Sequence, residues 1–389
     1  MRGALKAGAT TPFYLFSPLP VRRQLALLER LDFGVPVTHW LSCKTQPLPA
    51  LLEWWHRQNR PAEVVSELEY RTAWAAGFRD ILVNGPAKQR WLPEVAVPGQ
   101  RVHFDSLTEL RALLPQAKRQ QWRVGLRLCT SQEFDPGDPT LPTQFGFDPG
   151  EVPLAVKLLR KVGLEPQQVH FHLRTNVAEA GIYAAAAAEA LSICAAARWF
   201  PTILDCGGGL PPSHTRSLDG SAYGASMNLE SYAQGLRRVI REAGHIRELW
   251  LENGRFVLAD SGLLAIRVLD IKERRGVRQI LCDGGRTMNA LISTWENHAL
   301  EQLVPRRGVS LDSLVYGPTC MAFDRLARTT LPQSLKPGDV LLWMDAGAYH
   351  LPWETRFSHF LAEIWWERDS GTLACVRDAE HYAASRRVK

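Results

Sequence analysis

The chain has 389 residues and a formal net charge of +6, with 46% hydrophobic and 22% charged residues. This length suits two domains, and the composition is that of an ordinary globular protein. Acidic residues are nearly as common as basic ones and both are dispersed, so we expect no nucleic-acid partner. The remaining positive balance indicates a solvated surface rich in arginine, and attraction to an acidic partner or a phosphorylated ligand is the alternative.

No apolar run is long enough to span a bilayer, and the first residues lack the apolar core of a secretion signal. We therefore expect a cytoplasmic protein without a membrane partner. The seven cysteines are scattered and form no Cys-x-x-Cys pair, which indicates reduced thiols and argues against a structural zinc site.

Through about Leu251, short apolar runs alternate with amphipathic ones, which predicts a parallel sheet covered by helices. The expected strands are Val37–Leu41, Asp80–Val83, Val124–Leu128, Val169–Leu173, Thr202–Asp205 and Leu249–Glu252. The expected helices include Pro49–Gln58, Ser66–Ala76, Thr108–Leu114, Val152–Val162 and Ala184–Ala197. About eight such units fit a β/α barrel, and a doubly wound sheet is the competing fold.

After Glu252 the segments become short, β-prone and separated by turn residues, which predicts a second, mostly β domain. Its expected strands are Val257–Ala259, Ala265–Ile271, Gln279–Cys282, Ser313–Tyr316 and Val340–Trp343. Leu141–Gly150, rich in proline and glycine, is expected to be an ordered barrel loop.

Lys44, in the run Ser42–Gln46, stands at the end of the first expected barrel strand. An amine held there can form a Schiff base with an aldehyde cofactor if burial helps it to lose its proton near neutral pH. The competing interpretation is a solvated surface lysine.

The run Asp205–Pro211 contains three consecutive glycines after a strand. Their backbone N–H groups can approach an anion closely, so the run is either a phosphate cradle or a plain tight turn. Its spacing is neither that of a Walker A loop nor that of a dinucleotide fingerprint.

His170 and His172 are two residues apart on an expected strand and so face the same way. They suit a metal pair lacking an evident third ligand, a ring packed on a flat cofactor, or core histidines. Glu252, in Glu252–Arg255, can keep a pyridine nitrogen protonated or form a surface ion pair.

Cys320 lies in the expected turn Gly317–Asp324, where a thiol can donate a proton or remain inert. Tyr349 follows Gly347 and Ala348 in another expected turn, where its hydroxyl can hydrogen-bond a phosphate.

Taken in this order, the segments resemble the fold-type III pyridoxal-phosphate decarboxylases, the family of the ornithine and diaminopimelate decarboxylases. Further segments carry the same resemblance over nearly the whole chain. They are Ser66–Glu69 for Ser-x-x-Glu, Asp105–Leu110 for Asp-Ser-x-x-Glu-Leu, and Gln144–Gly146 for Lys-Phe-Gly with Gln in place of Lys.

The resemblance implies pyridoxal 5'-phosphate as cofactor and assigns a role to each matching residue. Lys44 is the Schiff-base lysine, His172 stacks on the ring, Glu252 pairs with the pyridine nitrogen, and Thr175, Gly207, Gly208, Gly209, Arg255 and Tyr349 hold the phosphate. The resemblance also implies a head-to-tail homodimer with shared active sites. In it, Cys320 of the partner subunit protonates the decarboxylated intermediate. Asp283, Cys320 and Met321 contact the substrate.

The implied fold is a cofactor-binding β/α barrel over residues 20–252 plus a β domain built from residues 1–19 and 253–389. The strand-like Thr11–Phe16 joins that second domain. The implied activity is decarboxylation of an amino acid to an amine and CO2, in amino-acid metabolism such as polyamine or secondary-metabolite biosynthesis.

Several residues depart from the family pattern, and the departures concern the substrate. Met321 replaces an acid after Cys320, Arg174 replaces Gly in His-x-Gly-Ser, Asn253 replaces Pro in Glu-Pro-Gly-Arg, and Ser293 falls near a missing arginine. The expected substrate is therefore a basic, modified or carrier-tethered amino acid rather than plain diaminopimelate. An amino-acid racemase of the same fold type and a catalytically silent, decarboxylase-like binding protein are the alternatives.

Overall fold

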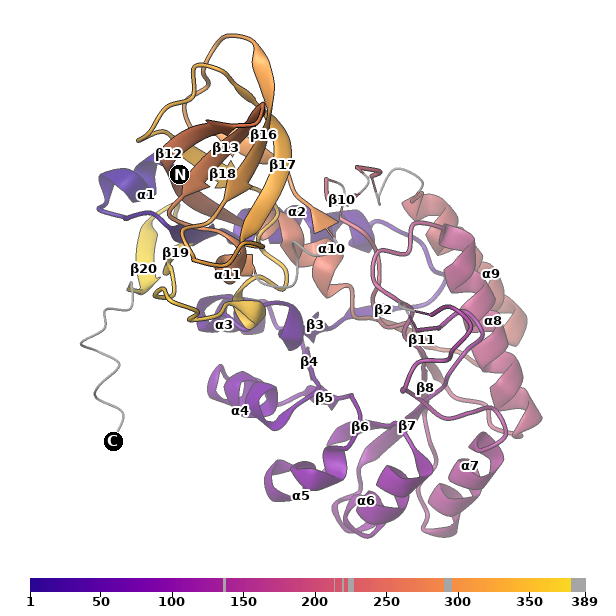
Figure 1. Cartoon of the computed structure of the whole chain (residues 1–389). Coiled ribbons are helices and arrows are strands. Elements are labelled where there is room, and N and C mark those ends of the chain that lie inside the picture. The colour runs from indigo at the N-terminus through magenta and orange to yellow at the C-terminus, as the bar shows by residue number, and fades with distance from the viewer. Residues whose placement is uncertain (136–137, 213, 219, 223–226, 290–295, 379–389) are drawn as a thin grey trace. The chain divides into compact units, whose positions relative to one another are not determined.

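The computed structural model describes residues 1–135, 138–212, 214–218, 220–222, 227–289 and 296–378 (Figure 1). The chain forms two compact units. The barrel unit comprises Ala26–Pro211 and Ala225–Phe256, and the sheet unit comprises Met1–Leu25, Pro212–Gly224 and Val257–Lys389. Each unit is described below by itself.

The barrel unit is built on a nine-stranded parallel sheet with the order β2-β11-β9-β8-β7-β6-β5-β4-β3. The strands are β2 (Val37–His39), β3 (Leu41–Ser42), β4 (Ala62–Val64), β5 (Ile81–Val83), β6 (Arg101–Phe104), β7 (Arg123–Arg127), β8 (Gln168–His170), β9 (Ile203–Asp205) and β11 (Glu248–Leu251).

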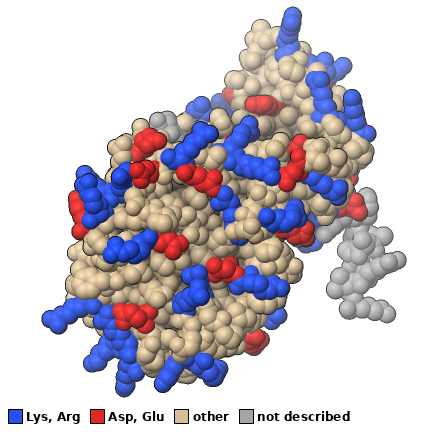
Figure 2. Space-filling view, turned by 180° about the vertical axis from the view of Figure 1, so that it is seen from behind, with Lys and Arg blue, Asp and Glu red and all other residues tan. Residues whose placement is uncertain are grey.

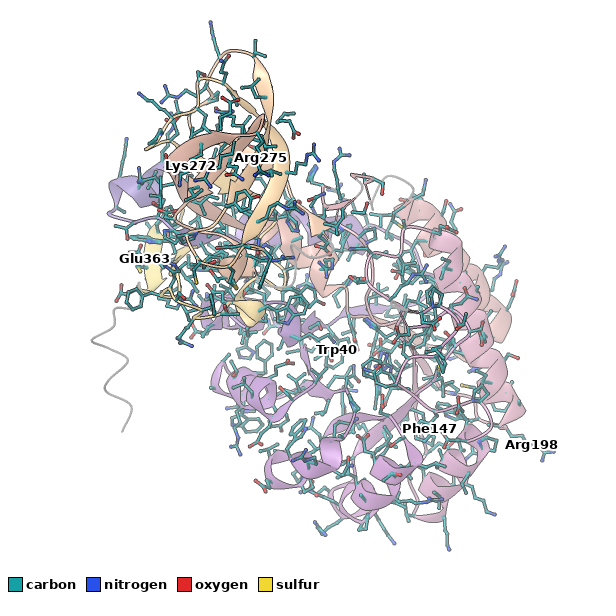
Figure 3. All side chains as sticks on the ribbon, viewed as in Figure 1. Trp40, Phe147, Arg198, Lys272, Arg275 and Glu363 are labelled. Carbon is teal, nitrogen blue, oxygen red and sulfur yellow. The ribbon has the colours of Figure 1, made fainter. Side chains whose placement is uncertain are left out.

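Trp40 alone separates β2 from β3, the two ends of the sheet order (Figure 3). Its backbone N–H donates to Leu251 on one side (2.9 Å), whereas the N–H of Leu41 donates to Pro61 on the other (3.1 Å). Residues 37–42 therefore act as one strand that closes the sheet on itself. The predicted barrel is confirmed, and the doubly wound sheet is excluded.

Helices follow the strands and cover the outside of the barrel (Figure 1). They are α3 (Pro49–Arg57), α4 (Glu67–Ala75), α5 (Leu92–Val95), α6 (Leu107–Gln120), α7 (Val152–Lys161), α8 (Ala180–Ala196) and α9 (Leu229–Ala243). Two of them begin with a serine N-cap, because Ser66 Oγ accepts from Glu69 N (3.3 Å) and Ser106 Oγ accepts from Glu109 N (3.2 Å).

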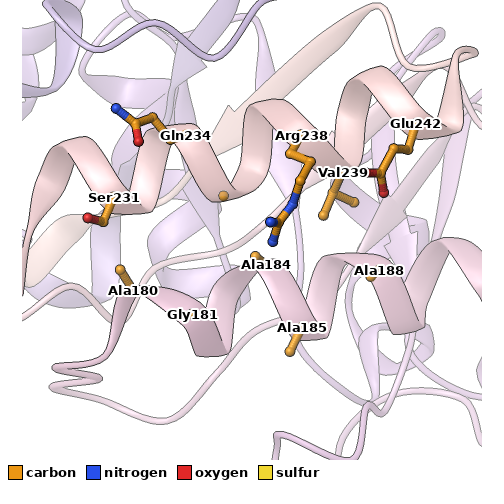
Figure 4. A pocket seen from close by; sticks show the side chains of 11 residues that line it. Ala180, Gly181, Ala184, Ala185, Ala188, Ser231, Gln234, Arg238, Val239 and Glu242 are labelled. Carbon is orange, nitrogen blue, oxygen red and sulfur yellow. The ribbon is translucent and has the colours of Figure 1, made fainter.

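The alanine-rich helix α8 lies side by side with α9 (Figure 4). A Cβ placed on Gly235 would lie 3.1 Å from the Cβ of Ala184, so small residues allow this close approach. Along the same contact lies a hollow lined by Ala180, Gly181, Ala184, Ala185, Ala188, Ser231, Gln234, Gly235, Arg238, Val239 and Glu242. All of its lining residues belong to α8 and α9, and none belongs to a strand.

Aromatic rings fill part of the barrel interior. The rings of Trp40 and Trp250 lie 4.8 Å apart and pack with buried Leu82. The rings of His103 and His170 lie 4.9 Å apart on neighbouring layers of the same interior. A rigid, filled interior of this kind fixes the strand ends, where the candidate site lies.

The sheet unit joins both ends of the chain, as predicted. Strand β1 (Phe13–Phe16) pairs antiparallel with β12 (Gly262–Arg274) and parallel with β19 (Glu363–Glu367). The other strands are β10 (Arg216–Ser217), β13 (Val277–Cys282), β14 (Glu296–Asn297), β15 (Leu300–Gln302), β16 (Ser310–Tyr316), β17 (Arg325–Pro332), β18 (Val340–Trp343) and β20 (Leu373–Arg377).

One predicted strand of this unit, Val257–Ala259, is wrong. These residues lie in α10 (Gly254–Leu258) and in the 3-10 helix Ala259–Ser261. All three are buried, and burial on successive positions suits a helical turn as well as a strand, so the local preference of Val257 for β-structure does not decide the conformation.

On the face shown in Figure 2, basic and acidic side chains are interspersed. Among the helices of the described residues, none combines the length and the apolar character needed to cross a lipid bilayer.

Candidate active site

A cavity of about 570 Å³ opens at the carboxyl ends of the barrel strands. Its lining includes Lys44, His172, Thr175 and Glu252, which follow β3, β8 and β11. The others are Glu63, Val65, Asn84, Gly85, Pro86, Arg127, Glu133, Phe134, Asp135, Thr143, Gln144, Phe145, His170, Leu173 and Arg174. In β/α barrels this edge is where active sites form.

Lys44 lies in the short 3-10 helix Cys43–Thr45, directly after β3. Its Nζ lies 3.6 Å from Oε2 of the fully buried Glu63, which also accepts from Ser42 Oγ (2.7 Å). The Lys44 side chain is 34% exposed, so its amine is held at the cavity surface rather than in bulk solvent.

Glu252 is buried at the end of β11, and its Oε1 accepts from Asn84 Nδ2 at 2.6 Å. Burial, with a smaller contribution from Asp205, raises the pKa of the Glu252 carboxyl well above its usual range. The carboxyl therefore holds a proton more readily than an exposed one does. It suits a partner with which it can share that proton, such as a ring nitrogen.

Three contacts show why residues 207–209 must be glycine. A Cβ on Gly207 would lie 2.5 Å from His172 Nδ1, and one on Gly208 would lie 2.5 Å from the Glu252 carbonyl oxygen. A Cβ on Gly209 would lie 2.8 Å from the Arg174 carbonyl oxygen, and Gly209 has a φ of +104°. The run therefore packs against the ends of β8 and β11.

Thr175 and Arg255 meet at the edge of this glycine run. Arg255 Nε donates to Thr175 Oγ1 at 2.9 Å. Within the described part of the chain, the backbone N–H of Gly209 has no hydrogen-bond acceptor. A guanidinium, a hydroxyl and a backbone N–H group near one another form a combination that suits a phosphate.

His172 lies beyond the end of β8, because that strand stops at His170 rather than at Leu173. Its Nδ1 accepts from Gly208 N at 3.2 Å, which assigns the proton of the neutral ring to Nε2. Burial lowers the pKa of both His170 and His172 well below the usual range, so both rings are neutral at pH 7.

Two groups of side chains have the spacing of metal ligands: His103, His170 and Asp205, and His170, His172 and Glu252. Glu252 is the third group that the sequence did not reveal beside the two histidines. Since Glu252 and His172 also line the cavity with Lys44, this second group belongs to the candidate active site.

Cys320 and Met321 lie in the sheet unit, in the turn between β16 and β17, and Cys320 is exposed. Buried Asp324 holds this turn, because its Oδ2 accepts from Thr319 N (3.1 Å) and Thr319 Oγ1 (2.6 Å). A Cβ on Gly285 would lie 2.3 Å from Gly317 Cα, so the turn packs closely on the segment that follows Asp283.

The Asp283 carboxylate accepts from Arg267 N at 2.7 Å in the sheet unit. This is a structural contact, and the substrate-binding role expected for Asp283 stays a prediction. Tyr349 has a φ of +63° and stacks on Trp353, with ring centroids 5.6 Å apart. Ser293 lies outside the described residues.

The structure brings to the cavity several residues that the sequence did not single out. Asn84 follows β5 and donates a hydrogen bond to Glu252. The carboxylate of Glu63, in β4, lies 3.6 Å from Lys44 Nζ. Arg127 Nη2 and Glu133 Oε1 form a buried ion pair at 2.7 Å. No local pattern marks these residues, because the strand ends that carry them are distant in sequence.

A parallel β/α barrel with a lysine, a buried carboxyl and an anion-binding glycine turn at its strand ends defines a class of barrel pyridoxal-phosphate enzymes. The chain belongs to the pyridoxal-dependent decarboxylases: the family model described as "Pyridoxal-dependent decarboxylase, C-terminal sheet domain" matches residues 13–347. The chain is thus a pyridoxal-phosphate-dependent amino-acid decarboxylase of the diaminopimelate and ornithine type.

Individual relatives agree with this assignment. The chain is 29% identical over 346 residues to a diaminopimelate decarboxylase of Deinococcus radiodurans, covering 87% of this chain and 85% of that one. It is 23% identical over 391 residues to the L-glutamyl-[BtrI acyl-carrier protein] decarboxylase of Niallia circulans, covering 92% and 88%.

The fold is shared with solved structures. The Helicobacter pylori diaminopimelate decarboxylase complexed with L-lysine superposes with a TM-score of 0.84 at 21% identity, covering 98% of this chain and 97% of that one. The arginine decarboxylase of Paramecium bursaria Chlorella virus gives a TM-score of 0.77 at 20% identity, covering 94% and 100%.

The residues at the cavity fit pyridoxal phosphate. The Lys44 amine lies at its surface, Glu252 is a buried carboxyl suited to a ring nitrogen, and the glycine run leaves no room for a side chain where it meets His172. The backbone N–H of Gly209 and the Arg255–Thr175 pair suit its phosphate.

Proposed function

We propose that this enzyme converts a modified or carrier-bound amino acid to an amine and CO2, with Lys44 as the cofactor lysine. The observation that carries the proposal is that Lys44, His172, Thr175 and Glu252 line one cavity at the barrel strand ends. They are the residues for which the family resemblance gave cofactor roles.

Each residue then has a defined task. Lys44 anchors the cofactor through its amine, and Glu63, 3.6 Å away, keeps that amine at the cavity surface. Neutral His172 offers a flat ring to one face of the cofactor, held through the Gly208 N–H. Bound pyridoxal phosphate supplies an electron sink for the pair left at Cα when CO2 departs.

Glu252 holds a proton at the ring nitrogen and so maintains that sink. Its orientation is set by Asn84, whose Nδ2 donates to Oε1. Thr175, Arg255 and residues 207–209 bind the phosphate, and the phosphate-binding role expected for Tyr349 stays a prediction.

We further propose that the active enzyme is a homodimer in which Cys320 of the partner subunit returns a proton to Cα. The exposed position of Cys320 and the rigid turn held by Asp324 support this role. In this proposal residues 20–252, together with Arg255, bind the cofactor, and the β domain of residues 1–19 and 253–389 supplies Cys320, Met321 and Asp283.

The choice of a modified or carrier-bound substrate depends on Met321, which stands where an acid would bind a distal ammonium. The Niallia circulans relative, named L-glutamyl-[BtrI acyl-carrier protein] decarboxylase, supports it.

The test is CO2 release from the holoenzyme with free ornithine, lysine, diaminopimelate, their N-acylated forms and carrier-bound amino acids. Efficient turnover of free ornithine or lysine would contradict the proposed substrate class. Racemisation without CO2 release would contradict decarboxylation itself. The Lys44→Ala variant is the inactive control.

A further inference from the structure

Arg174 lies two residues after His172, at the position of glycine in the family motif His-x-Gly-Ser. Its side chain lines the same cavity as Lys44, and its guanidinium carbon lies 4.6 Å from the ring centroid of Phe134. Phe134 belongs to the loop between β7 and α7, and within this loop Leu128 and Phe147 form an isolated parallel β-bridge. The guanidinium is therefore held between a strand end and this loop.

The other cations of the cavity already have carboxylate neighbours. Lys44 Nζ lies 3.6 Å from Glu63, and Arg127 pairs with Glu133 at 2.7 Å while stacking on Phe145 at 4.4 Å. Arg174 repeats the stacking of Arg127 on a phenylalanine of the same loop. Across the described residues, however, its guanidinium forms no ion pair and no hydrogen bond.

The acidic groups of the cavity are likewise engaged elsewhere. Glu63 accepts from Ser42, Glu252 from Asn84, Glu133 from Arg127, and Asp135 Oδ1 from the N–H of Asp138 at 3.1 Å. The positive charge of Arg174 is therefore not matched by a carboxylate of the cavity.

A cation–π contact with Phe134 uses none of the N–H donors of the guanidinium, so these donors remain available. The planar edge of a guanidinium matches a carboxylate in a bidentate arrangement. The backbone of Arg174 is also fixed, because its carbonyl oxygen packs closely against Gly209. A Cβ on Gly209 would lie 2.8 Å from that oxygen. A preorganised guanidinium of this kind orders few side-chain torsions when an anion binds.

We propose that Arg174 binds a carboxylate on the distal part of the substrate, so that this enzyme acts on an amino acid whose side chain ends in an anion. The inference rests on the proposed decarboxylation and names its substrate class. It also accounts for Met321, because a substrate with a distal carboxylate needs no acid beside Cys320.

The test uses holoenzyme and matched pairs of free amino acids that differ in the distal group. The carboxylate probes are L-glutamate, L-2-aminoadipate and N6-succinyl-L-lysine, and the uncharged partners are L-glutamine and N6-acetyl-L-lysine, with L-lysine as the cationic probe. Equilibrium binding is read from the visible absorbance of the bound cofactor, and CO2 release is measured separately.

We expect at least one carboxylate probe to bind about tenfold more tightly than its uncharged partner and than L-lysine. Arg174→Gln should weaken the binding of that probe by roughly 10- to 100-fold and leave the binding of its uncharged partner unchanged. Arg174→Lys should restore part of the preference. Arg241→Gln, on the exposed last turn of α9, is the matched control and should bind every probe as the wild type does.

Equal binding of the carboxylate and uncharged probes by the wild type would overturn the inference. So would equal losses for both in Arg174→Gln, or loss of the cofactor from that variant, which would assign Arg174 to the phosphate. Because binding and CO2 release are read separately, tight carboxylate binding without CO2 release would contradict the proposed decarboxylation and still support Arg174.

Discussion

Asn84 and Glu252 are 168 residues apart in the chain, yet Asn84 Nδ2 donates to Glu252 Oε1 at 2.6 Å inside the barrel. Asn84 follows β5 and Glu252 follows β11, so the closed sheet brings the two side chains to one cavity. In the proposed function, this contact orients the carboxyl toward the cofactor's ring nitrogen. The same contact explains why that carboxyl can stay buried.

Replacing Glu252 by Gln should leave the cofactor bound and reduce kcat by about 100-fold or more, because the ring nitrogen loses its proton-holding partner. Asn84→Ala should reduce kcat by about tenfold, as expected for a residue that orients a catalytic group. Steady-state rates and cofactor content are measured together. Unchanged kcat in Glu252→Gln would remove Glu252 from this role.

The close packing of Gly208 on Glu252 predicts a steric effect. In Gly208→Ala the new Cβ would meet the Glu252 carbonyl oxygen at 2.5 Å, so the variant should lose about 1–3 kcal/mol of stability and bind the cofactor weakly. Gly181→Ala, in α8 with no atom within 4 Å of its Cβ, should instead gain up to about 1 kcal/mol. Thermal unfolding and cofactor content compare the two; equal behaviour would contradict the packing argument.

Burial of Asp205 predicts the pH dependence of stability. Its Oδ1 accepts from Gly207 N, and burial raises its pKa to about 7. The folded protein then keeps a proton that the unfolded chain releases above about pH 4. The contribution of Asp205 to stability should therefore fall as the pH rises from about 4 to about 7, and level off above that.

Asp205→Asn should flatten this dependence in the cofactor-free protein, because the amide does not titrate. The measurement is the Tm of wild type and variant at several pH values across that interval. Parallel curves for the two proteins would show that Asp205 does not carry the effect.

The proposed sharing of active sites predicts complementation between two inactive proteins. Cys320→Ala should keep the cofactor but turn over slowly or give an aberrant product, whereas Lys44→Ala should lose activity altogether. Mixing the two should restore activity, because a hybrid dimer has one site with both residues intact. No recovery, with subunit exchange confirmed, would argue that Cys320 acts within its own chain or not at all.

The alternation of apolar and amphipathic runs was sufficient to predict the barrel, since each buried strand and its covering helix leave a clear pattern. The pattern missed β4 and β6, which are short and carry the buried polar residues Glu63 and His103. It also ended one helix at Leu114, whereas α6 continues through Pro115 to Gln120. Buried Leu113 and Ala117 keep that helix together despite the proline.

The site was predictable only where a local motif marks it. Lys44 and residues 207–209 stand in distinctive short runs, and the structure places both at strand ends. A second group of site residues is recognised only through contacts with neighbours far away in the sequence, such as Glu252 and Phe134. This group consists of Asn84, Asp205 and Arg174. Such pairings depend on the register of the closed sheet, which no single segment encodes.

Reduction of the holoenzyme with borohydride, followed by peptide mass spectrometry, identifies the residue that carries the cofactor, for which we propose Lys44. We expect a stable pyridoxyl group on Lys44 and loss of visible absorbance in Lys44→Ala. A label on another lysine, or none, would contradict this proposal.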